Sequence, residues 1–227
     1  MKLVIFGADR PIPINRGSVC TVEVENSCLF TRICRSIVEN GGASTFESFS
    51  LWNDAGDEVA SSRALLTISD PLHLPWDNPE LAGRLLTTME SFLFEDEDAR
   101  SLFESHGRQL QQFAYRLAYQ VESDYRFNIE WDLRRFLKSF GFAVDRGEGL
   151  PYIDTLNMFL DFVSDMKLGR VLVFVNLKTF LSENEFRQFL ERVFFREMSV
   201  LLLENKTCEI SYNQEEKIRI DQHFLEI

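Results

Sequence analysis

Residues 169–205 read GRVLVFVNLKTFLSENEFRQFLERVFFREMSVLLLEN, and this stretch decides the fold. It contains two apolar runs, Val171–Val175 and Val200–Leu203, of the kind found in strands that are buried on both faces. Between them, Ser182 and Glu185 form an S-x-x-E capping box at the start of a helical apolar pattern. Strand, capped helix and strand in this order predict a right-handed βαβ unit, so we expect a parallel sheet here.

The rest of the chain adds further strands to this unit. Apolar or alternating runs predict strands over Leu3–Phe6, Val19–Val24, Phe46–Trp52 and Ala64–Ile68, and again over Phe142–Val144, Glu209–Tyr212 and Lys217–Ile220. Asn26 or Ser27 can cap a helix directly after the second of these strands. Strands that alternate with helices predict an α/β head with a mostly parallel sheet.

A helical insertion interrupts this head. Asn78 followed by Pro79 is typical of a helix start, and no strand pattern occurs from there to Gly141. The acidic run Glu95–Asp98 separates the first of three expected helices from the second. We therefore expect an α/β head of residues 1–77 and 142–227, with an α-helical leg of residues 78–141.

Composition limits the environment of the protein. Of 227 residues, 45% are hydrophobic, which is enough to fill a core, and no apolar run is long enough to span a membrane. The first ten residues lack the apolar region of a signal peptide. The four cysteines show no C-x-x-C spacing, so we expect reduced thiols in a cytoplasmic protein.

Charge is unevenly distributed along the chain. The net charge of −12 argues against general affinity for nucleic acid. Between Arg100 and Arg146, however, there are eight basic and six acidic residues, so this segment carries +2 and the remainder −14. A local positive surface on the helical leg is therefore compatible with an acidic protein.

The strand–helix junction where a phosphate-binding loop would lie has no such loop. That loop needs glycines for close backbone approach, then Lys and Ser/Thr for phosphate and magnesium. Residues 25–28 here are Glu-Asn-Ser-Cys, without glycine or lysine. The three histidines are far apart in sequence, and no nucleophile motif occurs. We expect neither nucleotide hydrolysis nor a catalytic site.

Acidic residues at the junction of the second and third leg helices are candidates for metal binding. A hard divalent cation takes several oxygen ligands that converge from a turn. The candidates are Glu122, Asp124, Glu130 and Asp132, with Asn128 or a backbone carbonyl added. The alternative is a solvated polar connection whose acids cap helices. A metal-dependent nuclease is a further interpretation, but the acids lack the PD…E-x-K pattern.

Basic residues on the leg helices are candidates for contact with a phosphate backbone. Arg134 and Lys138 lie four residues apart on the third helix, next to Arg135, while Arg108 and Arg116 lie on the second. Such side chains can track phosphates without sequence preference. The alternative is that they belong to ordinary solvated helix faces.

Several segments together resemble one known family. They are RVLVFVN, FLSENEFRQFL and VLLLEN, preceded by DYRFNIEWDLRRFLKSFG. The chain resembles the small adaptation protein of type II-A CRISPR systems, in the Csn family, most strongly from Asp124 to Asn205. The resemblance implies a P-loop-NTPase-like α/β head without working nucleotide motifs, and an α-helical leg.

The resemblance also implies a function. Members of the family form homotetrameric rings that thread double-stranded DNA ends through a basic hole, and calcium ions stabilise the ring. They assist spacer acquisition alongside the CRISPR integrase and effector nuclease. By position, Glu130 and Asp132 match the acidic calcium-binding stretch, Asp124 falls where relatives carry an acid, and Glu122 is added by proximity.

Two other functions remain open on the sequence. The first is an enzyme, a divergent nucleotide-binding phosphotransferase of the same fold. The second is a protein-interaction scaffold that does not bind DNA. The Glu25-Asn26-Ser27 junction argues against the enzyme, because a carboxylate repels phosphate.

Overall fold

The chain forms two compact units. The structure is a computed structural model that describes residues 1–5, 8–39, 46–127 and 130–223. One unit, the head, comprises Met1–Pro75 and Arg146–Ile227, and the other, the leg, comprises Trp76–Asp145. The two units are described separately below.

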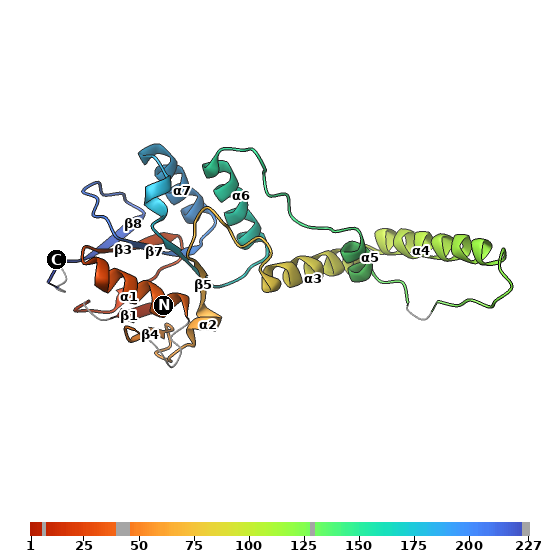
Figure 1. Ribbon diagram of the computed structural model, residues 1–227, viewed down its shortest axis with the longest axis horizontal. Helices are drawn as coiled ribbons and strands as arrows, with labels where there is room; N and C mark the ends of the chain where they lie inside the picture. The colour runs from red at the N-terminus through yellow and green to blue at the C-terminus, as the bar shows by residue number, and fades with distance from the viewer. Residues whose placement is uncertain (6–7, 40–45, 128–129, 224–227) are drawn as a thin grey trace. The chain divides into compact units, whose positions relative to one another are not determined.

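A five-stranded parallel sheet forms the centre of the head (Figure 1). Its strand order is β5-β6-β7-β3-β8, and all four neighbouring pairs run parallel. The strands are β3 (Ser18–Val24), β5 (Leu65–Ile68), β6 (Val171–Val175), β7 (Ser199–Glu204) and β8 (Glu215–Ile220). A short 3₁₀ turn, η1 (Leu177–Phe180), and helix α7 (Glu183–Phe195) connect β6 to β7. The predicted βαβ unit is confirmed.

The capping box at the start of α7 is confirmed as well. The Ser182 hydroxyl accepts a hydrogen bond from the Glu185 N–H at 3.4 Å, and the Glu185 carboxylate accepts one from the Ser182 N–H at 2.8 Å. These two bonds satisfy two N–H groups that have no partner within the helix. Helix α7 therefore begins at a defined residue and returns the chain to the sheet.

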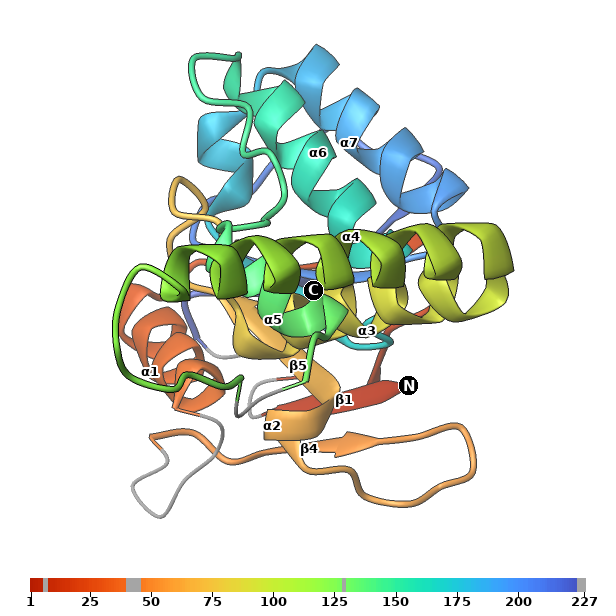
Figure 2. The same cartoon turned by 90° about the vertical axis from the view of Figure 1, so that its right-hand side faces the viewer.

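Both faces of the sheet are covered by helices. In β3, Cys20, Val22 and Val24 join the apolar cluster that contains helix α1 (Ser27–Val38). Side chains that alternate with these point to the other face, which carries α6 (Tyr152–Asp165) and α7 side by side (Figure 2). There the ring of Phe174 on β6 meets Phe189 on α7, with centroids 6.1 Å apart.

The predicted α/β head with a mostly parallel sheet is confirmed, and the first strands of the head form a separate antiparallel sheet beside it. Its order is β2-β1-β4, built from β1 (Lys2–Ile5), β2 (Ile12–Pro13) and β4 (Phe49–Trp52). Apolar periodicity identifies strands but does not specify their partners. Phe6, at the end of the first expected strand, lies outside the described residues.

Two other expected strands are absent from the described residues. Phe142–Val144 is irregular and belongs to the leg, where no described strand is available to pair with it. Glu209–Tyr212 is also irregular, and Tyr212 packs edge-on against Phe186 of α7 at 5.3 Å between ring centroids. Of the strands expected in this tail, the described residues up to His223 form only β8. A short helix, α2 (Ser61–Ala64), which the sequence did not predict, precedes β5.

The leg consists of three helices, α3 (Pro79–Glu95), α4 (Glu97–Ala118) and α5 (Leu133–Ser139). Each begins at a side-chain cap: Asn78, Asp96 and Asp132 accept backbone N–H groups of the first turn. Helix α3 packs against both α4 and α5. Across the part of the chain that the structure describes, no helix is both long and apolar enough to cross a membrane.

Candidate nucleic-acid interface

The junction between β3 and α1 is closed by its own hydrogen bonds. The Asn26 side chain accepts the N–H groups of Cys28 at 3.0 Å and Leu29 at 3.1 Å. Its amide also donates to the Gln222 carbonyl at 3.3 Å, and the Gln222 amide donates to the Glu25 carbonyl at 3.0 Å. The helix start therefore offers these N–H groups to a side chain and not to a phosphate, as expected for a fold without working nucleotide motifs.

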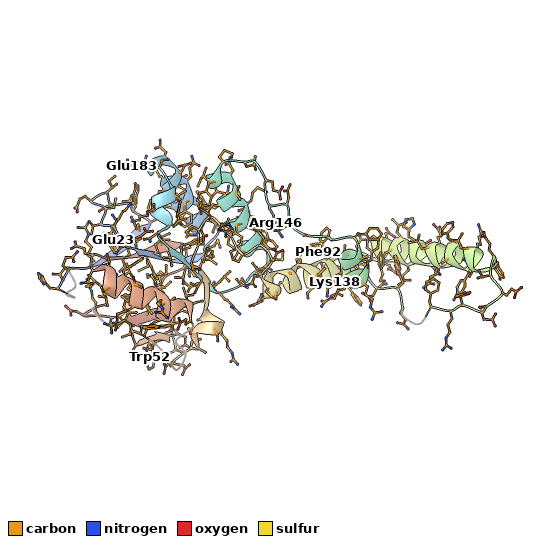
Figure 3. The ribbon with its side chains drawn as sticks, in the orientation of Figure 1. Glu23, Trp52, Phe92, Lys138, Arg146 and Glu183 are labelled. Carbon is orange, nitrogen blue, oxygen red and sulfur yellow. The ribbon has the colours of Figure 1, made fainter. Side chains whose placement is uncertain are left out.

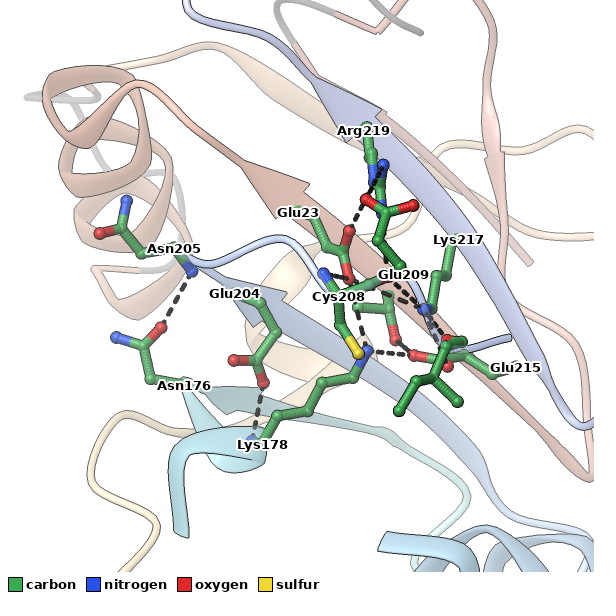
Figure 4. A network of polar contacts seen from close by, with 12 residues as sticks. Glu23, Asn176, Lys178, Glu204, Asn205, Cys208, Glu209, Glu215, Lys217 and Arg219 are labelled. Carbon is green, nitrogen blue, oxygen red and sulfur yellow. Dashed lines mark hydrogen bonds and ion pairs between the residues drawn. The ribbon is translucent and has the colours of Figure 1, made fainter. Parts of the chain in front are cut away.

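A network of buried ion pairs lies on the α7 face of the sheet, toward β8 (Figure 4). Glu23 on β3 is fully buried, and its carboxylate lies 2.9 Å from the Arg219 guanidinium and 3.5 Å from the Lys178 ammonium. Lys178 also lies 2.5 Å from the carboxylate of Glu215. Glu204, at the end of β7, accepts the Lys178 backbone N–H at 3.0 Å.

The network joins side chains of both charges and is largely buried. The carboxylates of Glu23 and Glu215 pair with the cations of Lys178, Lys217 and Arg219. Glu209 adds a carboxylate at 3.0 Å from Arg219, and Glu204 accepts the Lys178 backbone N–H. Burial is the main cause that raises the pKa of Glu204 to about 7. Sequence reasoning missed this cluster. The sequence signal that could have revealed the cluster is a glutamate near the end of each of two mainly apolar strands, SVCTVEV and SVLLLE.

Burial keeps two of the four thiols, Cys20 on β3 and Cys34 on α1, unreactive, whereas Cys28 is exposed. All four cysteines are free, as expected. Burial raises the pKa of the Cys20 thiol and of the Cys34 thiol to about 12, so both stay protonated at neutral pH.

A glycine in α4 allows the leg to pack tightly. A Cβ atom on Gly107 would lie only 2.5 Å from the indole of Trp131. The same indole meets Phe103 at 5.2 Å and Phe136 at 5.6 Å between ring centroids. This aromatic cluster holds the start of α5 against α4, next to the predicted metal-binding residues.

The four predicted metal-binding residues do not form a metal site in this structure. Glu122, Asp124 and Glu130 are exposed, and Asn128 lies outside the described residues. Asp132 caps α5 through the Arg135 N–H at 2.8 Å and pairs with the Arg135 guanidinium at 3.0 Å. Within residues 1–5, 8–39, 46–127 and 130–223, no group of three His, Cys, Asp or Glu side chains is arranged to hold a metal ion.

The five predicted phosphate contacts differ in their surroundings. Arg134 is engaged in contacts within the leg, because its guanidinium lies 2.7 Å from the Glu90 carboxylate and donates to the Thr87 hydroxyl at 3.0 Å. Arg135 pairs with Asp132. Arg108, Arg116 and Lys138 are exposed and form no ion pair with any described residue; Figure 3 labels Lys138 on α5. These three are the free cations of the set.

One face of α4 is apolar and exposed. At helical spacing, Leu102, Leu110, Phe113 and Leu117 form what we call the α4 stripe, and each side chain is between 52% and 59% exposed. Phe103 and Gly107 face Trp131 on a second side of the helix, while Arg108 and Arg116 lie on a third. Phe92, labelled in Figure 3, and Phe94 on α3 add exposed rings at 57% and 76%.

Together these features define a class: an α/β protein with a parallel sheet, a closed nucleotide-loop position and a helical insertion. The sequence profile of the family described as CRISPR-associated protein (Cas_Csn2) matches residues 44–224, and the chain belongs to this family. The expected resemblance is thereby confirmed. The fold is similar to that in the crystal structure of Stu0660 of Streptococcus thermophilus, at 15% identity and a TM-score of 0.62, over 97% of this chain and 74% of that one.

Proposed function

We propose that this CRISPR-associated protein is a non-catalytic, homotetrameric ring that binds double-stranded DNA ends during spacer acquisition. In this role it acts alongside the CRISPR integrase and effector nuclease, in the cytoplasm. Family membership supports the CRISPR-associated part of this role. The closed β3–α1 junction supports a function that does not depend on nucleotide hydrolysis.

The observation that supports association of several subunits is the α4 stripe. Four large apolar side chains on one face of a single helix are each more than half exposed. Contiguous apolar patches of this kind mark interaction sites. A second copy of the chain offers the same patch, so two stripes can cover each other in a symmetric, self-complementary contact that joins two of the four subunits.

The free cations of the leg support DNA binding. Arg108, Arg116 and Lys138 project from the same unit as the α4 stripe. The leg as a whole has eight basic and thirteen acidic residues, so attraction to DNA must come from where the cations lie and not from net charge. In a ring, repetition of one exposed cation in every subunit concentrates positive potential along the hole.

Calcium enters the proposal as a structural ion with Glu122, Asp124, Glu130 and Asp132 as candidate ligands. Because the described conformation does not bring them together, the proposal requires the connection between α4 and α5 to fold around the ion. Bound calcium would supply positive charge to an acidic surface.

Light scattering of the wild-type protein and of Phe113→Glu tests the assembly. We expect about four times the 26.5 kDa chain mass for the wild type and a smaller particle for the variant. Gln112→Glu adds the same charge at the neighbouring exposed position and should keep the wild-type mass. A wild-type protein of monomer mass, with and without calcium, would contradict the proposal.

The two alternative functions have separate tests. Saturable ATP binding that is lost on substitution of residues 25–28 would favour the phosphotransferase. A tetramer that binds no duplex in a gel-shift experiment would favour the interaction scaffold.

A further inference from the structure

A pocket of about 610 Å³ lies within the head, away from the ion-pair network. The amino ends of β6 and β7 form its floor, through Val171 and Ser199. The carboxyl ends of α6 and α7 and the segment before β3 form its walls. Its volume falls within the range of about 300–1,000 Å³ that is typical of small-molecule sites.

The charged residues of this pocket are mainly basic. Arg16, Lys167, Arg170 and Arg196 line it, against only two acidic side chains, Asp54 and Glu197. This excess stands out in a chain whose net charge is −12. The pocket therefore favours an anionic ligand.

Helix ends explain only part of the positive charge. The carboxyl end of a helix carries partial negative charge and attracts cations, which accounts for Lys167 after α6 and Arg196 after α7. Arg196 also pairs with Asp161 at 2.9 Å and Asp165 at 3.3 Å. Arg170 donates to the Leu65 carbonyl at 3.4 Å, so it has a structural partner in the head. Arg16 precedes β3 and lies in no helix, so a helix end does not account for it.

The walls that carry these cations have a defined backbone. Both helices end in the same way, with a left-handed residue after the last turn: Lys167 at φ 49° and Glu197 at φ 50°. The following N–H groups return to the helices, from Leu168 to the Val163 carbonyl at 3.4 Å and from Met198 to the Val193 carbonyl at 3.0 Å. The pocket therefore requires little ordering before a ligand binds.

From the cavity, its basic lining and these fixed helix ends, we propose that the pocket binds a phosphate ester. Arginine guanidinium groups match the oxygens of a phosphate in a bidentate arrangement. The remaining lining includes Ile14, Val163, Leu168 and Met198, which can cover an apolar part of the ligand. A volume of about 610 Å³ exceeds what phosphate alone fills, so the ligand is a phosphate ester of nucleotide size or a phosphate of a nucleic acid.

Calorimetry with pyrophosphate and with deoxyadenosine monophosphate tests the free-ligand source, at constant ionic strength maintained with potassium chloride. The variant is Arg16→Gln with Lys167→Gln, and the control is Arg187→Gln, an exposed α7 residue outside the pocket. We expect saturable binding to the wild type and the control, and affinity roughly tenfold or more weaker in the double variant. Arg16→Gln alone replaces the double variant if the latter melts earlier than the wild type without ligand.

A gel shift with linear duplex tests the nucleic-acid source, which rests on the proposed function. If neither small phosphate binds but duplex affinity falls in the double variant and not in Arg187→Gln, the ligand is a nucleic-acid phosphate and the proposal holds. Two results overturn the proposal. In the first, the small phosphates do not bind and duplex affinity is equal in all variants. In the second, the small phosphates bind the wild type and all variants equally. A wild-type protein without duplex affinity overturns the proposed function, while calorimetry still decides the pocket.

Discussion

Gly107 shows the effect of a single residue on the leg. No side chain other than hydrogen fits there, because the Trp131 indole lies where a Cβ atom would be. The cost of glycine in a helix is about 1 kcal/mol relative to alanine. The close approach of Trp131 offsets that cost by joining α4 to the start of α5 through an aromatic cluster.

The two helical glycines of the leg make a matched test of this account. Gly107→Ala should lower the free energy of unfolding by about 1–3 kcal/mol, because the added methyl group forces Trp131 to move. Gly83→Ala on α3 meets nothing within 4 Å, so it should stabilise the leg by about 0.5–1 kcal/mol. Thermal denaturation followed by circular dichroism measures both. Equal effects of the same sign would contradict the packing argument.

Glu204 makes the stability of the head depend on pH. Burial raises the folded-state pKa to about 7 from an ordinary value of 4.5, so the folded protein holds this proton more tightly than the unfolded chain. The resulting stabilisation is fully present below pH 4.5 and is lost as the pH rises toward about 7.

Glu204→Gln removes this titration and keeps an oxygen to accept the Lys178 N–H. The variant should therefore unfold at a higher temperature than the wild type at a pH of about 8, by up to about 3 kcal/mol in free energy. The difference should shrink as the pH falls toward 4.5. Melting curves across this range measure it, and a constant offset between the two proteins at every pH would show that Glu204 does not titrate as described.

At the scale of elements, the sequence predicted the features that depend only on residues close together in the chain. The helix caps at Asn26, Asn78 and Ser182 and the βαβ unit follow from neighbouring residues, and all are confirmed. The pairing of β1 with β4, by contrast, joins residues about 50 positions apart and depends on which edges are free. Periodicity alone cannot supply that information.

The same limit applies to the candidate site. The basic and acidic residues of the leg were identifiable from their spacing, whereas the pairing of Arg134 with Glu90 crosses from α5 to α3 and was not. The Glu23 network and the basic pocket were also missed. Each gathers residues from distant segments, so no single window of sequence contains it.

The connection between α4 and α5 is the element on which the calcium prediction rests. Calcium that binds only the folded protein should raise its melting temperature with increasing concentration. Glu130→Gln with Asp132→Asn should abolish this increase, and asparagine preserves the cap of α5. Glu95→Gln with Glu104→Gln removes two acids outside the connection and should respond like the wild type. An undiminished calcium response in the first variant would contradict the assignment.

At the scale of the whole molecule, the α4 stripe and two of the free cations, Arg108 and Arg116, lie on different faces of α4. A helix that is apolar on one side and basic on another can join subunits and face a ligand at once. The proposal uses both faces: the stripe for assembly, and Arg108 and Arg116 for DNA. The acidic residues elsewhere limit nonspecific attraction to nucleic acid.

Charge reversal measures how much Arg108 and Arg116 contribute to duplex affinity. Arg108→Glu with Arg116→Glu should lower duplex affinity by more than one phosphate contact usually contributes, because a ring repeats each change in every subunit. Arg134→Glu serves as a comparison, since it also breaks the pair with Glu90 and should lower the melting temperature. Unchanged affinity after reversal at Arg108, Arg116, Arg134, Arg135 and Lys138 would place the DNA elsewhere.

The central claim is that the protein encircles DNA and therefore loads from an end. The most direct measurement compares, in one competition gel shift, a covalently closed circular duplex with the same molecule linearised at a single site. We expect the linear form to bind far more tightly, with affinity that falls steeply as salt rises and changes little with sequence. Equal affinity for the linear and circular forms would contradict the account.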